Sequence, residues 1–247
     1  MISAEMRQNG SNPRVLFIGR KNCDLSNQLY EHIIDCDFSV KAVFPSQRGE
    51  SFVKQVEEWE GDYIFSFRNL VILPTSLIAK ARIAAINFHP GPPEYPGSGG
   101  VNFAIYEGRT EFGVTAHLMT DRVDSGPIIQ VRRLPIEDSD DLNSLLARTH
   151  ELLLNLAKDV ISEIKNSGPE KILNLDDDLP RPQWSGTRRT IEAVNRLQKI
   201  NSNIKKKDLE RIIRATHLEK FPVKIYLFDY EFILASEKPY DLDGTQE

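Results

Sequence analysis

Short apolar runs alternate with helical spacings over the first 90 residues, and no other feature of the sequence constrains the fold as strongly. Four runs rich in β-branched and aromatic residues occupy residues 15–19, 38–44, 63–67 and 84–86. Apolar residues at helical spacing separate these runs, over residues 25–34, 52–59 and 75–81. Strands that alternate with helices form parallel sheets covered on both faces. The sequence therefore predicts an α/β fold with a Rossmann-like, mostly parallel sheet and helices on both faces.

The rest of the chain predicts one long helix and a small C-terminal region. The long helix covers residues 141–165, and an acidic linker that contains proline follows at residues 174–182. Further on we expect helices and a β-hairpin, at residues 191–200, 207–215 and 223–234. The expected parts are a polar tail, a catalytic domain and a small C-terminal region, with bounds at residues 1–13, 14–173 and 174–247.

Charge and hydropathy narrow the classes of function. A formal net charge of −5 over 247 residues gives no general attraction to nucleic acid, so we expect a small-molecule substrate and no nucleic-acid partner. No apolar run approaches the roughly 20 residues that cross a bilayer. Residues 1–13 lack a signal-peptide core, and we expect a soluble, cytoplasmic protein without a membrane partner. Cys23 and Cys36 lack a zinc spacing, and both are expected to be reduced.

The turn after the first apolar run carries no dinucleotide fingerprint. It reads Gly19-Arg20-Lys21-Asn22 and lacks the Gly-x-Gly-x-x-Gly pattern. Those glycines let a backbone approach a pyrophosphate closely. We therefore expect no dinucleotide cofactor.

Asn87 and His89 stand at the end of the fourth apolar run, in the sequence Asn87-Phe88-His89-Pro90. Side chains two positions apart on a strand share one face. An amide N–H can donate to an oxyanion, and an imidazole can take or deliver a proton near neutral pH. The pair suits acyl-type transfer. The alternative is structural, with Asn87 capping the strand end and His89 bonding a loop carbonyl.

A second motif covers residues 113–130 and predicts a strand, an acidic turn and another strand. Asp124 lies in the turn Val123-Asp124-Ser125-Gly126-Pro127, where a carboxylate can orient His89 and stabilise its cation. His117 lies on the strand before the turn. With Asp124 it makes an imaginable metal pair, but no third ligand stands at a fitting spacing. We therefore expect no metal, and a structural or supporting role for His117.

Together the two motifs resemble the formyltransferase family that uses N10-formyltetrahydrofolate. Asn87-Phe88-His89-Pro90 matches the Asn-x-His-Pro of that family, and residues 113–129 match its Gly-Val-Thr…Val-Asp-Ser/Thr-Gly-Pro-Ile-Ile. The resemblance covers residues 14–166. It implies that Asn87, His89 and Asp124 are catalytic and that N10-formyltetrahydrofolate is the formyl donor.

The same resemblance implies where the pterin ring of the donor is held. The family uses backbone groups beside the third strand and in the acidic loop, at positions matched by Phe67, Arg68, Leu70, Val71, Thr120, Asp121 and Val123. Backbone recognition leaves a weak trace in a sequence. Arg68 can equally be a solvated loop charge.

Candidates for binding a sugar and a diphosphate come from residue chemistry. Glycines let backbone N–H groups approach a ligand, and tryptophan and arginine can stack on a base or hold phosphates. On these grounds the candidates are Tyr95, Ser98, Gly99, Asn102, Trp184, Arg188 and Arg189. Alternatively, Trp184 is a buried structural anchor, and Arg188 and Arg189 are surface cations.

Residues 91–100, Gly-Pro-Pro-Glu-Tyr-Pro-Gly-Ser-Gly-Gly, distinguish subgroups of the family. They depart from the Ser-Leu-Leu-Pro of the purine and tRNA enzymes and resemble enzymes that formylate nucleotide-linked amino-deoxysugars. The resemblance implies TDP-4-amino-4,6-dideoxyglucose as the acceptor, for surface polysaccharide (O-antigen) biosynthesis. A TDP-3-amino sugar or GDP-perosamine is the next expectation.

Three other functions remain as alternatives. A methionyl-tRNA formyltransferase needs a basic C-terminal barrel, and the roughly 65 residues after Pro180 are too few and too mixed in charge for one. A formyltetrahydrofolate hydrolase would share the three catalytic residues. A non-catalytic folate or nucleotide binder could share the fold without the chemistry.

The expected C-terminal hairpin carries a large apolar surface, made by Phe221, Ile225, Leu227, Phe232 and Ile233. Little chain is left to cover it, so we predict a homodimer through this region. Part of the surface could instead pack on the catalytic domain. Pro222 and Lys224 are also typical of a protected sheet edge.

Overall fold

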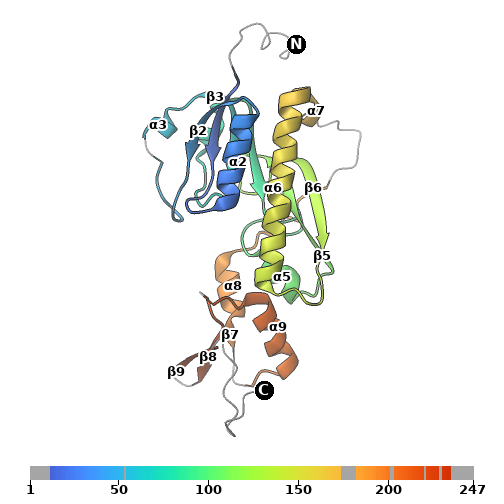
Figure 1. The fold of residues 1–247 in the computed structure, drawn as a ribbon. Helices are drawn as coiled ribbons and strands as arrows, with labels where there is room; N and C mark the ends of the chain where they lie inside the picture. Colours follow the sequence, from blue (N-terminus) through green and yellow to red (C-terminus); the bar gives the residue numbers. More distant parts are fainter. Residues whose placement is uncertain are drawn as a thin grey trace.

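The computed structural model describes residues 12–52, 54–173, 182–200, 203–219, 221–227 and 230–234. Its main sheet contains six strands, β1 to β6, which are Arg14–Ile18, Ser39–Val43, Gly61–Phe67, Ala81–His89, Glu111–Leu118 and Ile128–Pro135. Their order is β2-β1-β3-β4-β5-β6 (Figure 1). The first four strands run parallel, whereas β5 and β6 are antiparallel to their neighbours. The predicted mostly parallel sheet is confirmed.

Helices cover both faces of this sheet, as the alternation of strands and helices predicts. The helices α2 to α7 are Asp24–Asp35, Lys54–Glu57, Thr75–Ile78, Gly100–Tyr106, Leu142–Ser167 and Glu170–Leu173. Side chains alternate across β1, so that Phe17 packs beneath α2 while Leu16 packs on the opposite face, in the cluster that includes Leu77 of α4. Figure 1 shows α2 and α6 side by side on one face.

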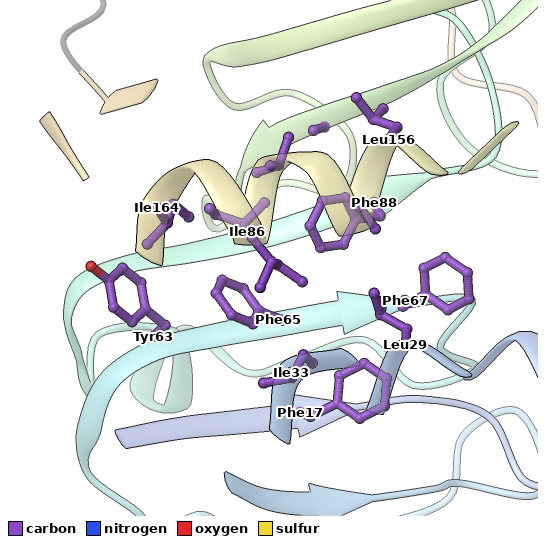
Figure 2. Packing of buried hydrophobic residues seen from close by; sticks show 14 of the residues in the cluster. Phe17, Leu29, Ile33, Tyr63, Phe65, Phe67, Ile86, Phe88, Leu156 and Ile164 are labelled. Carbon is purple, nitrogen blue, oxygen red and sulfur yellow. The ribbon is translucent and has the colours of Figure 1, made fainter. Parts of the chain in front are cut away.

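The long helix α6 is the main cover of the sheet. Asp141 caps its first turn, because the Asp141 carboxylate accepts from the Ser144 N–H at 2.8 Å and the Ser144 hydroxyl accepts from the Asp141 N–H. Leu156 is fully buried on its inner face, in the same core as Ile86 of β4 (Figure 2). The helix thus anchors the middle of the strand whose end carries Asn87 and His89.

The strand β4 is longer than the apolar run alone indicates and continues through His89. Asn87 pairs in register with His117 of β5, and His89 pairs with Thr115. A register shift between Ala116 and His117 marks an irregularity in the pairing of β5 with β6. Irregularities of this kind re-aim side chains beside functional sites.

The C-terminal region packs on the end of the main sheet. It contains α8, β7, α9, β8 and β9, which are Ile191–Leu197, Lys199–Ile200, Lys206–Thr216, Lys224–Leu227 and Tyr230–Ile233. Val194 of α8 and Ala215 of α9 share a hydrophobic cluster with Phe103 of α5 and Leu142 of α6. The expected hairpin is present as β8 and β9, and the short parallel strand β7 beside β8 was not foreseen.

Two expectations fall partly or wholly outside the described residues. The linker at residues 174–182 is described only at its last position, and residues 1–11 of the polar tail are also outside. Among the described helices, none is both long enough and apolar enough to cross a membrane.

Candidate active site

The three residues expected to be catalytic meet at the carboxyl end of β4. Asn87 and His89 extend from β4, and Asp124 comes from the loop between β5 and β6, where its backbone adopts a left-handed φ of 49°. His89 Nδ1 lies 3.3 Å from Asp124 Oδ2. The N–H of Gly97 donates to the same carboxylate oxygen at 2.8 Å. The Asp124 carboxylate is therefore held between an imidazole and a backbone donor.

His117 joins this group directly. Its Nδ1 lies 2.8 Å from the Leu118 carbonyl oxygen, an arrangement that assigns the proton to Nδ1 in the neutral ring. His117 Nε2 then accepts from the Asn87 amide at 3.1 Å and lies 3.5 Å from Asp124 Oδ1. Sequence reasoning gave His117 a structural or supporting role. The contacts of His117 fit a supporting role, because they orient the Asn87 amide.

Burial controls the ionisation of this cluster. His89 is 5% exposed, and burial lowers the pKa of its imidazole. Asp124 raises this pKa but offsets the effect of burial only in part, and His117 lowers the pKa further. Burial alone would raise the pKa of Asp124, but His89, His117 and the Gly97 N–H together lower it to about 2. Near neutral pH the cluster therefore holds a neutral His89 and an ionised Asp124.

The orientation of His89 defines which nitrogen can accept a proton. Its Nε2 lies 3.0 Å from the Tyr95 carbonyl oxygen, so the neutral ring carries its proton there. Nδ1 is then the basic nitrogen, and it faces Asp124. A proton taken up at Nδ1 creates an imidazolium beside a carboxylate, which is the arrangement that stabilises a general base after it has acted.

A cavity of about 360 Å³ opens over the cluster. All four polar residues of the cluster, Asn87, His89, His117 and Asp124, line it. Of the residues expected to hold the pterin, Arg68, Leu70, Val71, Thr120, Asp121 and Val123 line the cavity. Phe67 is fully buried and is not one of the lining residues.

The expected sugar and diphosphate residues divide into two groups. Ser98, Gly99, Asn102 and Arg188 line the cavity, whereas Tyr95, Trp184 and Arg189 do not. The Tyr95 hydroxyl is held in the core by Glu107 at 2.7 Å. The Arg189 guanidinium pairs with Glu107 at 2.6 Å and lies over Phe103. Trp184 packs against the two histidines of the cluster.

Four basic side chains that sequence reasoning did not select also line the cavity, namely Arg20, Arg48, Arg122 and His150. The three arginines among them, together with Arg68 and Arg188, make the cavity wall strongly basic. Within the described ranges, none of these five arginines has a carboxylate partner in an ion pair. Burial, Arg68 and Arg20 lower the pKa of His150 to about 3, so it lines the cavity as a neutral ring. The sequence contained a signal for Arg20, because it lies in the turn after β1, at the carboxyl end of a strand, where α/β proteins place their sites.

The described residues contain no group of three or more histidine, cysteine, aspartate or glutamate side chains able to hold a metal ion. The cluster contains an oriented amide, a neutral base and an ionised carboxylate.

Comparisons with known proteins agree with the motifs. A family model described as formyl transferase matches residues 2–161. Methionyl-tRNA formyltransferase from Listeria monocytogenes serotype 4a (strain HCC23) is 28% identical over 203 residues, which cover 78% of this chain and 62% of that protein. The chain thus spans about six tenths of the length of this curated relative.

Solved structures share the fold across almost the whole chain. A sugar N-formyltransferase from Shewanella sp FDAARGOS_354 has a TM-score of 0.70 and 20% identity, covering 90% of this chain and 96% of that one. The N-formyltransferase from Helicobacter canadensis, in complex with folinic acid and dTDP-3-aminofucose, has a TM-score of 0.65 and 17% identity, covering 87% of this chain and 84% of that one. With well over half of its length matched by the family model, and with both motifs gathered at one cavity, the chain belongs to the formyl transferase family.

Proposed function

We propose that this protein transfers a formyl group from N10-formyltetrahydrofolate to the amino group of a nucleotide-linked amino-deoxysugar. One observation carries the proposal: a neutral imidazole, an ionised carboxylate and an oriented amide meet at a cavity whose wall holds five arginines without carboxylate partners among the described residues. The cluster suits acyl transfer, and the arginines suit a polyanionic ligand.

The roles of the three residues follow from their contacts. The Asn87 amide nitrogen lies 3.1 Å from His117 Nε2 and 3.5 Å from Asp124 Oδ1. The longer of these two contacts gives way when the amide donates to the formyl oxygen, as that oxygen gains negative charge. His89 takes the proton of the attacking amine at Nδ1, beside Asp124. The same proton then passes to N10 as the bond between the formyl carbon and N10 breaks. Asp124 stays ionised throughout and stabilises the transient imidazolium.

The cavity wall includes both apolar and basic residues. Leu70, Val71, Ile72 and Leu73 follow β3, and Met119 follows β5, giving an apolar part suited to a pterin ring. Arg20, from the loop after β1, and Arg188 give positive charge suited to phosphate oxygens. The Helicobacter canadensis protein, solved in complex with folinic acid and dTDP-3-aminofucose, supports a site for two such ligands.

The first acceptor to test is TDP-4-amino-4,6-dideoxyglucose, with a role in surface polysaccharide (O-antigen) synthesis. The support is the glycine- and proline-rich sequence of residues 91–100, of which Gly97, Ser98, Gly99 and Gly100 line the cavity. TDP-3-amino sugars and GDP-perosamine are the next acceptors to test. A binding screen with TDP, GDP and UDP identifies the nucleotide, since a ligand at 100 times its dissociation constant stabilises the fold by about 2.7 kcal/mol.

A second candidate is methionyl-tRNA formylation, which the Listeria relative favours. Against it stands the formal net charge of −5. Binding to tRNA depends on many phosphate contacts, which a protein of this charge does not generally provide.

One assay separates these functions. The protein is incubated with N10-formyltetrahydrofolate and either an amino-sugar nucleotide, methionyl-tRNA or no acceptor, and the products are identified by mass spectrometry. The proposal expects formylated sugar nucleotide and an equal amount of tetrahydrofolate. Formyl-methionyl-tRNA would support the second candidate, and free formate without an acceptor would indicate a hydrolase. The variant His89→Ala controls for non-enzymatic transfer.

We also propose that the protein is a homodimer formed through the C-terminal hairpin. Phe221, Tyr230, Phe232 and Ile233 are exposed by 66%, 71%, 52% and 57% in the single chain. Such a grouping of large apolar side chains is typical of an interface. Light scattering at micromolar concentration tests this proposal. A mass of 28.1 kDa would reject it, and a dimer that survives deletion of residues 221–247 would place the interface elsewhere.

A further inference from the structure

A segment of the C-terminal region lies along the loop that follows β4. The N–H of Ser185 donates to the Pro93 carbonyl oxygen at 3.0 Å, and the N–H of Arg189 donates to that of Pro96 at 2.8 Å. The loop supplies two backbone contacts of the catalytic cluster, the Tyr95 carbonyl oxygen that faces His89 and the Gly97 N–H that donates to Asp124. Residues 184–190 therefore support the cluster although they lie outside the part of the chain matched by the family model.

Close approach between the segment and the loop requires glycine at position 97. Gly97 has a φ of +94°, and a Cβ atom on it would lie 2.2 Å from the carbonyl oxygen of Arg189. No side chain fits that space. The contact brings the start of the segment, at Trp184, against the catalytic cluster.

Trp184 contacts both histidines of the cluster. Its ring centroid lies 5.7 Å from that of His89 and 5.0 Å from that of His117, and the edge-to-face angles are 70° and 85°. The indole N–H donates to the Gly126 carbonyl oxygen at 2.8 Å, two residues after Asp124. Trp184 thus contacts both imidazoles edge to face, and it is not one of the residues that line the cavity.

We propose that Trp184 is a positioning residue of the catalytic cluster. Its ring keeps water away from His89 and His117, and its N–H holds the loop that carries Asp124. The kinetic part of this inference rests on the proposed function. Its other part concerns the free protein alone, because the environment of His89 can be measured without any substrate.

The expected effect on His89 has a definite sign. The titratable groups that face His89 are Asp124, from the loop, and His117, from β5, while residue 184 presents an uncharged indole. Removing the indole admits water, which lessens the burial that disfavours the imidazolium. In Trp184→Ala the proton on His89 should therefore be lost at higher pH than in the wild type.

The test is a titration of the histidine ring nitrogens by NMR in the free protein, with His89 assigned by comparison with His89→Gln. We expect Trp184→Ala to move the His89 midpoint to higher pH. Trp184→Phe keeps the aromatic contact and loses the hydrogen-bond donor, so its midpoint should stay near that of the wild type. The matched control is Trp59→Phe, since Trp59 is the other tryptophan and lies in a separate core cluster.

Turnover gives the second readout. Trp184→Ala should lower kcat about a hundredfold, as expected for a misplaced catalytic group, and move the acidic limb of the kcat/KM profile in the direction of the titration. Trp184→Phe should lower kcat by about three- to tenfold through the lost hydrogen bond, without moving that limb.

An unchanged His89 midpoint in folded Trp184→Ala would overturn the inference, and so would an equal change in Trp59→Phe. If Trp184→Ala does not fold, Trp184→Leu repeats the titration with most of the apolar volume kept. Should the wild type formylate none of the acceptors, the proposed function fails while the titration still decides the role of Trp184.

Discussion

Replacing Asp124 by asparagine removes the charge of the catalytic cluster while keeping its shape. His89, His117 and the Gly97 N–H lower the pKa of Asp124 from 3.8 to about 2. Since a tenfold change in an ionisation constant is about 1.36 kcal/mol, the cluster favours the ionised carboxylate by roughly 2 to 3 kcal/mol. The imidazolium formed during transfer loses a comparable stabilisation in Asp124→Asn. A loss of that size lowers kcat by roughly a hundredfold.

The pH dependence of this variant gives a sharper test than the rate alone. Asp124 raises the pKa of His89 against the effect of burial. Without the carboxylate, His89 stays neutral to lower pH, so the acidic limb of kcat/KM should move to lower pH while the maximum falls. This direction is opposite to that expected for Trp184→Ala.

Steady-state formyl transfer from pH 5 to 9 measures both quantities. The matched control is Asp62→Asn, since Asp62 is also buried in an ion pair, with Arg82, but stands at the amino end of β3. The control should lose stability and keep its pH profile. The reasoning fails if folded Asp124→Asn retains at least a third of wild-type turnover, or if its acidic limb moves upward.

Three further predictions concern the base, the basic wall and the core. His89→Ala and Asn87→Ala should each lower kcat by on the order of a hundredfold or more with an unchanged circular dichroism spectrum, and near-normal turnover in both would place the chemistry elsewhere. Arg20→Gln should raise the KM of the nucleotide sugar several-fold at constant kcat, because it removes binding shared by ground and transition states; the surface variant Arg211→Gln should leave KM unchanged. Leu156→Ala should lower the free energy of unfolding, measured in urea, by about 2–5 kcal/mol. A change below about 0.5 kcal/mol would show that the core beneath α6 relaxes to fill the space left by the leucine side chain.

The parts of the structure that local patterns determine were predictable from the sequence. The period of two along β4 places Asn87 and His89 on one face, and the apolar stripe over residues 141–165 predicts α6. The helix α5 was missed because its first residue, Gly100, continues a glycine-rich run typical of a loop, although Val101, Ala104 and Ile105 have an apolar helical spacing.

Contacts between distant segments were not predictable in the same way. Trp184 and Arg189 have the right chemistry to bind a nucleotide, but their orientation depends on partners far away in the chain, Gly126 and Glu107. His150 lies on the predicted long helix, and only the packing of α6 on α2 and on the sheet brings it near Arg20 and Arg68. Side-chain direction at such positions follows from tertiary structure rather than from residue type.

The position of Asn87 and His89 on one strand has a consequence for how such a protein can diverge. Their backbone spacing is about 6.8 Å, two strand residues, and it is fixed by the pleat and by pairing with β3 and β5 on either side. The loops that line the cavity contribute nothing to this spacing. Insertions and substitutions in those loops can therefore exchange one acceptor for another over evolutionary time, while the distance between the amide and the base stays constant.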